Sequence, residues 1–145
     1  MKAMKTLSFL LFAGVLLAGC TKDVYVQGTE MTFHDYDVRS SQWQLWGDSW
    51  CATLDVPSIT QDIIRNGNVQ VSRRYPGGMY DEDVWTPLPS MRVEVTEGAD
   101  GGDFYYTTFI DYEWTARTVN IFVTTSDLYT EEVPGDMSFR VFVTR

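Results

Sequence analysis

Alternation of apolar and polar side chains is the feature that most restricts how this chain can fold. In SFRVFVTR, residues 138–145, the side chains of Phe139, Val141 and Val143 fall on one face of an extended strand, and those between them fall on the other. A period of two is that of a strand with one buried face, and it does not fit a helix. The C-terminal segment is therefore predicted to be a half-buried strand.

The same alternation recurs in segments rich in Val, Ile, Thr and aromatic residues, which are typical of strands. The further predicted strands are 31–38 (the weakest pattern), 41–46, 50–56, 68–75, 91–98, 103–112 and 118–125. Their predicted inward residues include Trp43 and Leu45; Trp50, Ala52, Leu54 and Val56; Val69 and Val71; Val93 and Val95; and Val119, Ile121 and Val123. In 103–112, large residues occupy both faces. The count is seven or eight strands.

Turn residues separate these strands. YPGGMY, residues 75–80, suits a tight reversal, and GADGG, residues 98–102, is typical of a hairpin loop. TPLPS, residues 86–90, carries two prolines, which cannot donate backbone hydrogen bonds within a central strand.

One segment, residues 57–67, has helical rather than strand spacing. Ser58 is predicted to cap the helix with Gln61 as its capping-box partner, and Asn66-Gly67 is predicted to end it in a left-handed conformation. Such a helix would cross from one sheet to the other. Together these signals predict an all-β domain over residues 31–145, an antiparallel, immunoglobulin-like β-sandwich of seven to eight strands with one short helical crossover. A barrel is the alternative.

The N-terminus has the layout of a secretory signal over residues 1–19, with Lys2 and Lys5 before an apolar run too short to span a membrane. LAGC, which ends at Cys20, resembles the lipobox of bacterial lipoproteins. The resemblance implies cleavage before Cys20, a diacylglycerol on its thiol and a fatty acyl chain such as palmitate on its new amine. The alternative is a plain secretory signal with an incidental cysteine. Residues 20–30 would then be a lipidated tether.

The tether also bears on location. The resemblance to lipoproteins implies sorting to the cell outer membrane, because Thr21 stands where an aspartate would retain some of them in the inner membrane. Lys22-Asp23 is similar to part of the charged tethers used for surface export. The predicted partner is therefore the membrane, reached through the Cys20 lipid.

The net charge of −9 argues against nucleic acid as a partner, because phosphate binding needs a basic surface. The acidity also disfavours binding to an anionic lipid surface. Protein or glycan partners stay open.

No catalytic constellation stands out. Cys51 is predicted to be a buried thiol and His34, the single histidine, a partly exposed strand residue. Neither the acidic run 81–83 nor Asp100 and Asp103 matches a calcium loop, and they are interpreted as solvated loops, so no metal or cofactor is predicted. A carboxylate-dependent hydrolase would need a cleft with two converging carboxylates, which a small sandwich has little room for.

Aromatic residues are numerous, with five tryptophans and eight tyrosines. Trp43 and Trp50 have the phase of core residues. Three other rings lie out of phase with the core and are the candidate ligand- or partner-binding residues: Trp46, Phe122 and Phe142. Exposed rings can stack on sugars or anchor a partner, although cross-strand pairing on an outer face explains them equally.

Three short motifs resemble those of small, uncharacterised lipoproteins of the Bacteroidetes type. They are a helix-then-strand "I…NG.V.V", a "W..LP" and a closing "FRV.V", at Ile59, Ile63, Asn66, Gly67, Val69, Val71, Trp85, Leu88, Pro89, Phe139, Arg140 and Val141. The resemblance implies a lipid-anchored β-rich domain and no known active site. The expected function is thus non-catalytic binding or a structural role at the outer membrane, with a glycan-binding module and a small hydrolase as alternatives.

Overall fold

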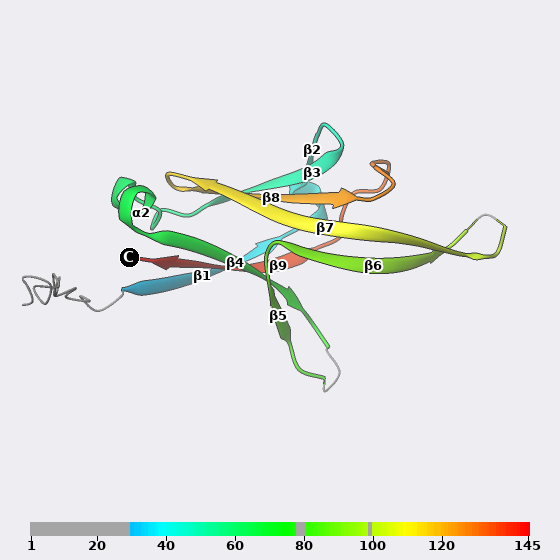
Figure 1. Ribbon diagram of the computed structural model, residues 1–145, viewed down its shortest axis with the longest axis horizontal. Helices are drawn as coiled ribbons and strands as arrows, with labels where there is room; N and C mark the ends of the chain where they lie inside the picture. The colour runs from blue at the N-terminus through cyan, green and yellow to red at the C-terminus, as the bar shows by residue number, and fades with distance from the viewer. Residues whose placement is uncertain (1–29, 78–80, 99) are drawn as a thin grey trace, which may run out of the picture.

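The computed structural model describes residues 30–77, 81–98 and 100–145, which form nine strands in two antiparallel sheets. Sheet A has the strand order β1-β9-β4-β5, and sheet B has the order β2-β3-β8-β7-β6. The two sheets lie face to face (Figure 1), so the predicted all-β antiparallel sandwich is confirmed, with one strand more than the upper predicted count.

The strands of both sheets lie close to their predicted positions. Sheet A contains β1 (Met31–Val38), β9 (Met137–Thr144), β4 (Asn68–Tyr75) and β5 (Val84–Pro87). Sheet B contains β2 (Gln44–Trp46), β3 (Ser49–Asp55), β8 (Thr118–Thr125), β7 (Asp103–Thr115) and β6 (Ser90–Glu97). The additional strand is β5, which lies at the edge of sheet A, where Pro87 is tolerated.

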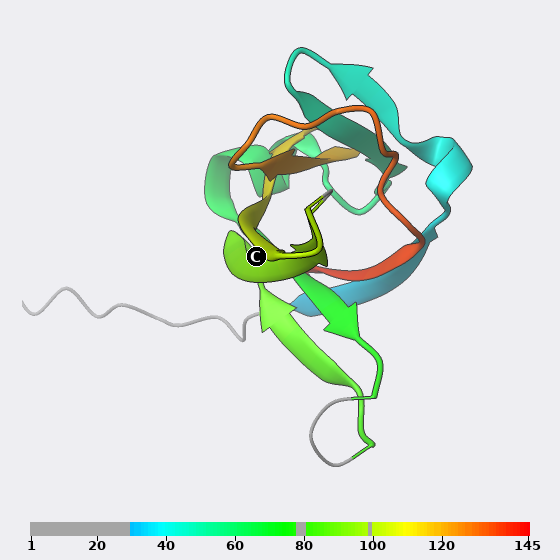
Figure 2. The same ribbon diagram turned by 90° about the vertical axis from the view of Figure 1, so that its right-hand side faces the viewer.

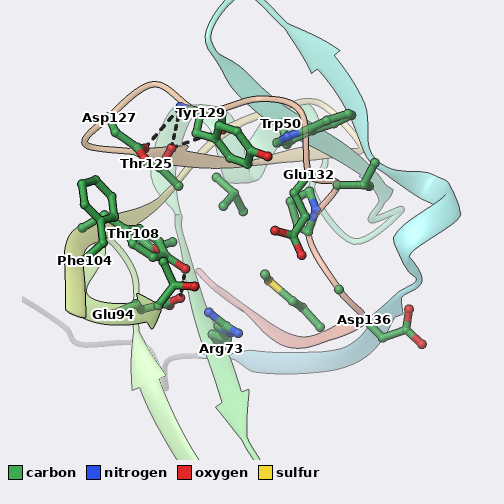
Figure 3. Close-up of a pocket in the computed structure, with 17 residues that line it drawn as sticks. Trp50, Arg73, Glu94, Phe104, Thr108, Thr125, Asp127, Tyr129, Glu132 and Asp136 are labelled. Atoms are coloured by element: carbon green, nitrogen blue, oxygen red, sulfur yellow. Dashed lines mark hydrogen bonds between the residues drawn. The ribbon is translucent and has the colours of Figure 1, made fainter. Parts of the chain in front are cut away.

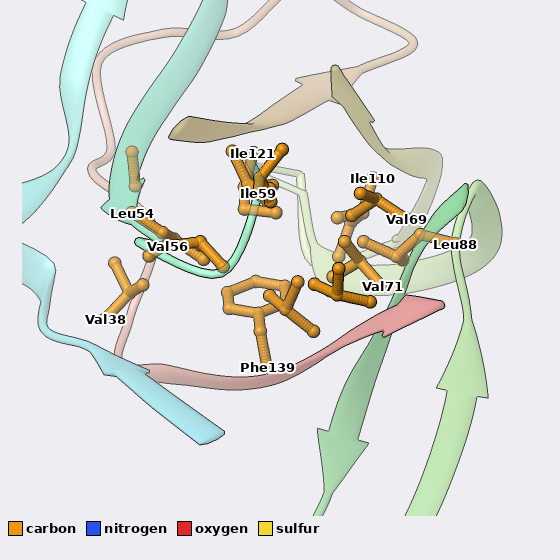
Figure 4. Packing of buried hydrophobic residues seen from close by; sticks show 14 of the residues in the cluster. Val38, Leu54, Val56, Ile59, Val69, Val71, Leu88, Ile110, Ile121 and Phe139 are labelled. Atoms are coloured by element: carbon orange, nitrogen blue, oxygen red, sulfur yellow. The ribbon is translucent and has the colours of Figure 1, made fainter. Parts of the chain in front are cut away.

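The core lies between the central strands of the two sheets. On β9, Phe139 and Val141 have no exposed surface, and neither have Val119 and Ile121 on β8. Figure 4 shows the Phe139 ring among aliphatic side chains from both sheets. The ring of Trp43 meets Phe139 edge-on, with centroids 6.5 Å apart. The predicted inward phase of these central strands is confirmed.

The predicted inward phase of β6 is wrong. Val93 and Val95 are 70% and 57% exposed, whereas Glu94, between them, faces inward and is half-buried. β6 is the edge strand of sheet B and pairs only with β7 among the described residues. Its inner side faces polar groups rather than the core, so the apolar side points to solvent.

The strand predicted over 41–46 is shorter than expected. A 3-10 turn (Ser40–Gln42) precedes β2, and Leu45 is 52% exposed, which corrects its predicted inward placement. Trp43 is buried as predicted, and its Nε1 donates a hydrogen bond to the Gly135 carbonyl oxygen at 3.2 Å.

The crossover helix α2 (Gln61–Asn66) links β3 of sheet B to β4 of sheet A and ends at Asn66-Gly67, as predicted, but its predicted N-cap and the predicted left-handed conformation of its end are wrong. Thr60, not Ser58, is the N-cap, and its hydroxyl accepts from the Ile63 N–H at 3.4 Å. Gly67 has φ of −111° rather than a left-handed conformation. The glycine is needed because a Cβ there would collide with the carbonyl oxygen of Thr144 on β9.

β6 and β7 form a hairpin, as predicted, and its turn includes Gly98, Gly101 and Gly102; residue 99 lies outside the described residues. Gly98 and Gly102 are joined by a 2.7 Å backbone hydrogen bond, and Gly101 has φ of +79°, which glycine adopts readily. The other predicted reversal joins β4 to β5, but residues 78–80 lie outside the described residues.

The two ends of the described chain lie side by side near α2 (Figure 1). The Arg145 N–H donates to the Glu30 carbonyl oxygen at 3.0 Å, and Arg145 Nε lies 2.6 Å from Asp62 Oδ2 on α2. Cys20, the predicted signal and the predicted tether up to residue 29 lie outside the described residues. Within residues 30–77, 81–98 and 100–145, no helix is long and apolar enough to cross a membrane.

Candidate ligand-binding pocket

A cavity of about 610 Å³ opens between the two sheets, at the end of the sandwich away from α2 and the chain ends. Side chains from six strands, β3, β4, β6, β7, β8 and β9, line this inter-sheet pocket, together with residues of the segment 127–136 between β8 and β9. Viewed from that end, this connecting segment arches over the opening (Figure 2). The volume falls in the range of small-molecule sites.

The pocket forms where polar residues replace apolar ones on the inward faces of the strands. Arg73 on β4 and Thr108 on β7 are in phase with buried Val71 and Ile110 nearer the core, and Glu94 on β6 is in phase with Arg92 and Thr96. Closing the sheets on each other here would bury a guanidinium and a carboxylate, which costs several kcal/mol per ion unless they are well paired. The sheets therefore enclose a hollow at this end.

Aromatic rings form much of the wall. Trp50 and Tyr129 lie on one side of the pocket, and Phe104 lies on the β7 side (Figure 3). The rings of Phe104 and Tyr106 are stacked, with centroids 6.4 Å apart and 23° between their planes. These side chains offer flat apolar surfaces to an occupant.

The charge around the pocket is mainly negative. Four acidic residues lie around it, Glu94, Asp127, Glu132 and Asp136, against the guanidinium of Arg73, but the Asp136 carboxylate points away from the cavity and accepts from the Ser40 N–H at 2.7 Å (Figure 3). The hydroxyl of Tyr106 donates to Glu94 Oε2 at 3.0 Å. That hydrogen bond, with lesser contributions from burial and from the charges of Glu94, Glu132 and Asp127, raises the pKa of Tyr106.

Arg73 reaches into the pocket from sheet A (Figure 3). Its NH1 donates to the Tyr75 hydroxyl at 3.0 Å, and its guanidinium lies 4.2 Å from the Tyr75 ring centroid. Burial lowers the pKa of Arg73, which the neighbouring Tyr75 and Glu94 partly offset, and an arginine stays protonated even so. The Arg73 Nε is buried without a hydrogen-bond partner among the described residues.

Local hydrogen bonds shape the start of the segment between β8 and β9. The Tyr129 N–H donates to Thr125 Oγ1 at 3.1 Å and to Asp127 Oδ1 at 3.2 Å. The hydrogen bond from the Thr125 side chain lowers the pKa of Asp127, despite opposition from desolvation. These bonds hold Tyr129 against the pocket mouth.

The aromatic residues predicted as binding candidates lie elsewhere. Trp46, 68% exposed, packs edge-on against Phe122 with centroids 6.4 Å apart on the outer face of sheet B. Phe142 lies on the outer face of sheet A, on the other side of the sandwich, where its ring centroid is 6.1 Å from that of Phe33. The three do not form one site. Phe142 and Phe33 are a directly opposed cross-strand pair, as the cross-strand interpretation expects, whereas Trp46 reaches Phe122 across the intervening strand β3.

Next to Phe142, an arginine is held between two aromatic rings. The Arg140 guanidinium lies 4.9 Å from the Phe33 ring centroid and 4.1 Å from that of Trp85. It also makes a two-bond contact with Asp35, with Nε–Oδ1 at 2.6 Å and NH2–Oδ2 at 2.8 Å. These contacts tie β1, β9 and β5 together, so this face is explained by stability.

This ion pair predicts a pH dependence. The hydrogen bond from Arg140 lowers the pKa of Asp35 below 3.8, so the pair stabilises the fold above that pH and loses its effect as the pH falls through the folded-state pKa. Asp35→Asn is expected to lower the urea midpoint modestly at pH 7 and not at pH 2. Asp48→Asn, at an exposed turn, is the control and should leave both midpoints unchanged. An equal loss at both pH values would contradict this prediction.

A second apolar surface lies on the outer face of β6 and β7. It consists of exposed side chains in adjacent register: Met91, Val93 and Val95 on β6, and Tyr105 and Phe109 on β7. Glu97 and Asp103 bound it at one end. Contiguous exposed apolar residues of this kind are typical of contact surfaces.

The remaining candidate residues have structural surroundings. Cys51 is a free, buried cysteine, as predicted, and burial raises the pKa of its thiol. His34 is an exposed residue of β1, in line with the strand position predicted for it. Across the described ranges, no group of three or more His, Cys, Asp or Glu side chains is arranged to hold a metal ion.

Sequence reasoning missed the pocket because its residues come from six strands and the segment between β8 and β9. The available signal was a polar or charged residue in the inward phase of a strand, such as Arg73 in line with Val69 and Val71. That signal was hidden on β6, where the assumed phase placed Glu94 outside.

No protein-family model, curated protein or solved structure matches this chain.

Proposed function

We propose that this protein is a lipid-anchored, non-catalytic binding protein of the outer membrane, displayed at the cell surface, with the inter-sheet pocket as its binding site. The observation that carries the binding role is the cavity itself, with aromatic walls and unpartnered buried donors. A cavity of this size in a small sandwich forgoes packing that would otherwise stabilise the core. Retaining it is reasonable where the space has an occupant.

The anchoring part of the proposal rests on the N-terminal sequence. The apolar run 7–17 and the small residues before Cys20 have the form of a lipoprotein signal. Two or more acyl chains on one residue give stable anchoring, because each buried CH₂ contributes about 0.8 kcal/mol. Since the described N-terminus lies at the end opposite the pocket, such an anchor would leave the pocket facing away from the membrane.

Membrane partitioning tests this anchoring. Cys20→Ala is expected to move the protein from the detergent phase into the aqueous phase of a Triton X-114 separation, and to abolish labelling by an alkyne fatty acid. Cys51→Ala is the matched control, because the Cys51 thiol is buried and should not accept lipid. Membrane retention of the Cys20→Ala protein would refute the anchor.

A carboxylate-dependent hydrolase is the second candidate, because Glu94 and Glu132 both line the pocket. Acid–base catalysis needs carboxylates held firmly on the two sides of the scissile bond. Glu94 is held by Tyr106, but Glu132 belongs to an irregular segment and makes no hydrogen bond within the described part of the chain. Binding without turnover therefore fits better than hydrolysis. If the wild type released new reducing ends from any oligosaccharide, and Glu132→Gln abolished that release, the non-catalytic proposal would be overturned.

A further inference from the structure

We propose that the inter-sheet pocket binds a neutral sugar residue of a glycan chain. This inference rests on the binding function proposed above and names the class of ligand. It is carried by three properties of the pocket: unused hydrogen-bonding groups of both kinds, aromatic walls, and an excess of negative charge.

The polar groups call for a ligand that both donates and accepts hydrogen bonds. Arg73 Nε and Trp50 Nε1 are buried donors without partners in the part of the chain that the structure describes, and each such group costs about 1–3 kcal/mol when left unpaired. Glu94 and Glu132 present acceptor oxygens to the same cavity. A sugar hydroxyl serves both sides, because it donates one hydrogen and accepts through two lone pairs.

The aromatic walls of the pocket suit the apolar C–H faces of a sugar ring. The flat rings of Trp50, Phe104 and Tyr129 line the pocket around these polar groups. A pyranose ring presents C–H groups on its faces and hydroxyls around its rim, so its faces match aromatic surfaces while its rim meets charged side chains. A purely apolar ligand would leave the Arg73 guanidinium and the carboxylates unpaired, which is unfavourable.

The charge of the pocket further limits the class of ligand that it can bind. The half-buried carboxylate of Glu94 and the exposed carboxylates of Asp127 and Glu132 at the rim repel an anionic ligand, although water screens the two exposed charges. The Arg73 guanidinium is already engaged by the Tyr75 ring and hydroxyl, which limits its capacity to neutralise a ligand carboxylate. The pocket should therefore discriminate against uronic acids and sialic acids.

The test uses the mature, lipidated protein in detergent. Thermal unfolding is measured against neutral oligosaccharides, uronate-containing oligosaccharides, polyamines and basic peptides, because a ligand that binds the folded state raises the unfolding temperature. The expected result is a rise with a neutral oligosaccharide and affinities at least tenfold weaker for matched uronate-containing chains. Equal or tighter binding of the uronate-containing chains overturns the proposal.

Two variants tie the binding to the pocket. Trp50→Phe keeps a ring but removes the Nε1 donor, and should weaken binding by about three- to tenfold, the value of one hydrogen bond. Trp46→Phe makes the same change on the outer face of sheet B and should have no effect. A double variant, Glu94→Gln with Glu132→Gln, should reduce the discrimination against uronates. Equal weakening by the two tryptophan variants overturns the assignment to the pocket.

The panel also separates this inference from the proposed function. A rise produced by polyamines or basic peptides alone, and lost in the Glu94→Gln and Glu132→Gln double variant, refutes the sugar while the binding role stands. If none of the four ligand classes raises the unfolding temperature, the sugar is refuted and the pocket-binding role loses its support. Neither outcome bears on the Cys20 anchor.

Discussion

Replacing Phe139 with alanine is expected to lower the free energy of unfolding by about 3–5 kcal/mol, the usual cost of removing a fully buried ring. Phe139 has no exposed surface, and its ring contacts the inner layers of both sheets. The vacated space would be lined by rigid strands and by Trp43, which packs edge-on against the ring, so little of it can collapse. Urea unfolding followed by tryptophan fluorescence gives the change.

Phe142→Ala is the matched control for this substitution. It removes the same ring three residues along β9, on the outer face of sheet A, where the side chain remains partly exposed. Its loss should be clearly smaller, because the site is open to water and no closed cavity forms. Similar losses for the two variants would mean that the outer face of sheet A is covered and that the assigned core is wrong.

Replacing Gly67 with alanine should have the second-largest effect, a loss of about 1–3 kcal/mol from overpacking. The new Cβ would meet the Thr144 carbonyl oxygen and lie 3.1 Å from the Cδ1 of Ile63. Both neighbours are constrained, since Thr144 belongs to β9 and Ile63 is the buried residue of α2 itself. Relief requires α2 to move away from sheet A, which should also appear as faster amide exchange in the helix.

Gly135→Ala provides the comparison, because a Cβ at Gly135 meets nothing within 4 Å. At a site without a clash, exchanging glycine for alanine is neutral or stabilises by about 0.4–1 kcal/mol through the unfolded chain. If Gly67→Ala behaved like Gly135→Ala, the contact between the helix end and β9 would not exist as described.

The alternation pattern predicted the central strands well because two buried faces constrain them. Val119 on β8 and Val141 on β9 are fully buried on interior strands, where the inward face packs against the other sheet. The alternation of apolar residues is therefore enough to predict which face of these strands is buried. At the sheet edges the same pattern is ambiguous. Val93 and Val95 alternate as regularly, yet they point to solvent, because the side of β6 that faces sheet A meets a polar hollow.

The candidate site was less predictable for a related reason. Periodicity identifies large residues that do not point into the core, and on that basis it identified Trp46 and Phe142. It does not distinguish a residue on an outer face from one that lines an internal cavity. The pocket depends on where β4 and β6 lie relative to each other, and on a segment without regular structure between β8 and β9. Those placements follow from the packing of the whole sandwich rather than from any single segment.

The hydrogen bond between Arg145 and Glu30 has a practical consequence for experiments on this protein. A fluorescent protein or epitope fused after Arg145 would emerge beside Glu30, on the side of the domain that the proposed Cys20 anchor would place nearest the membrane. It would also endanger the ion pair of Arg145 with Asp62. The β6–β7 hairpin extends from the other end of the molecule (Figure 1), so a small epitope inserted between Gly101 and Gly102 would keep clear of both chain ends, although it would lie near the pocket residues Thr96 and Phe104.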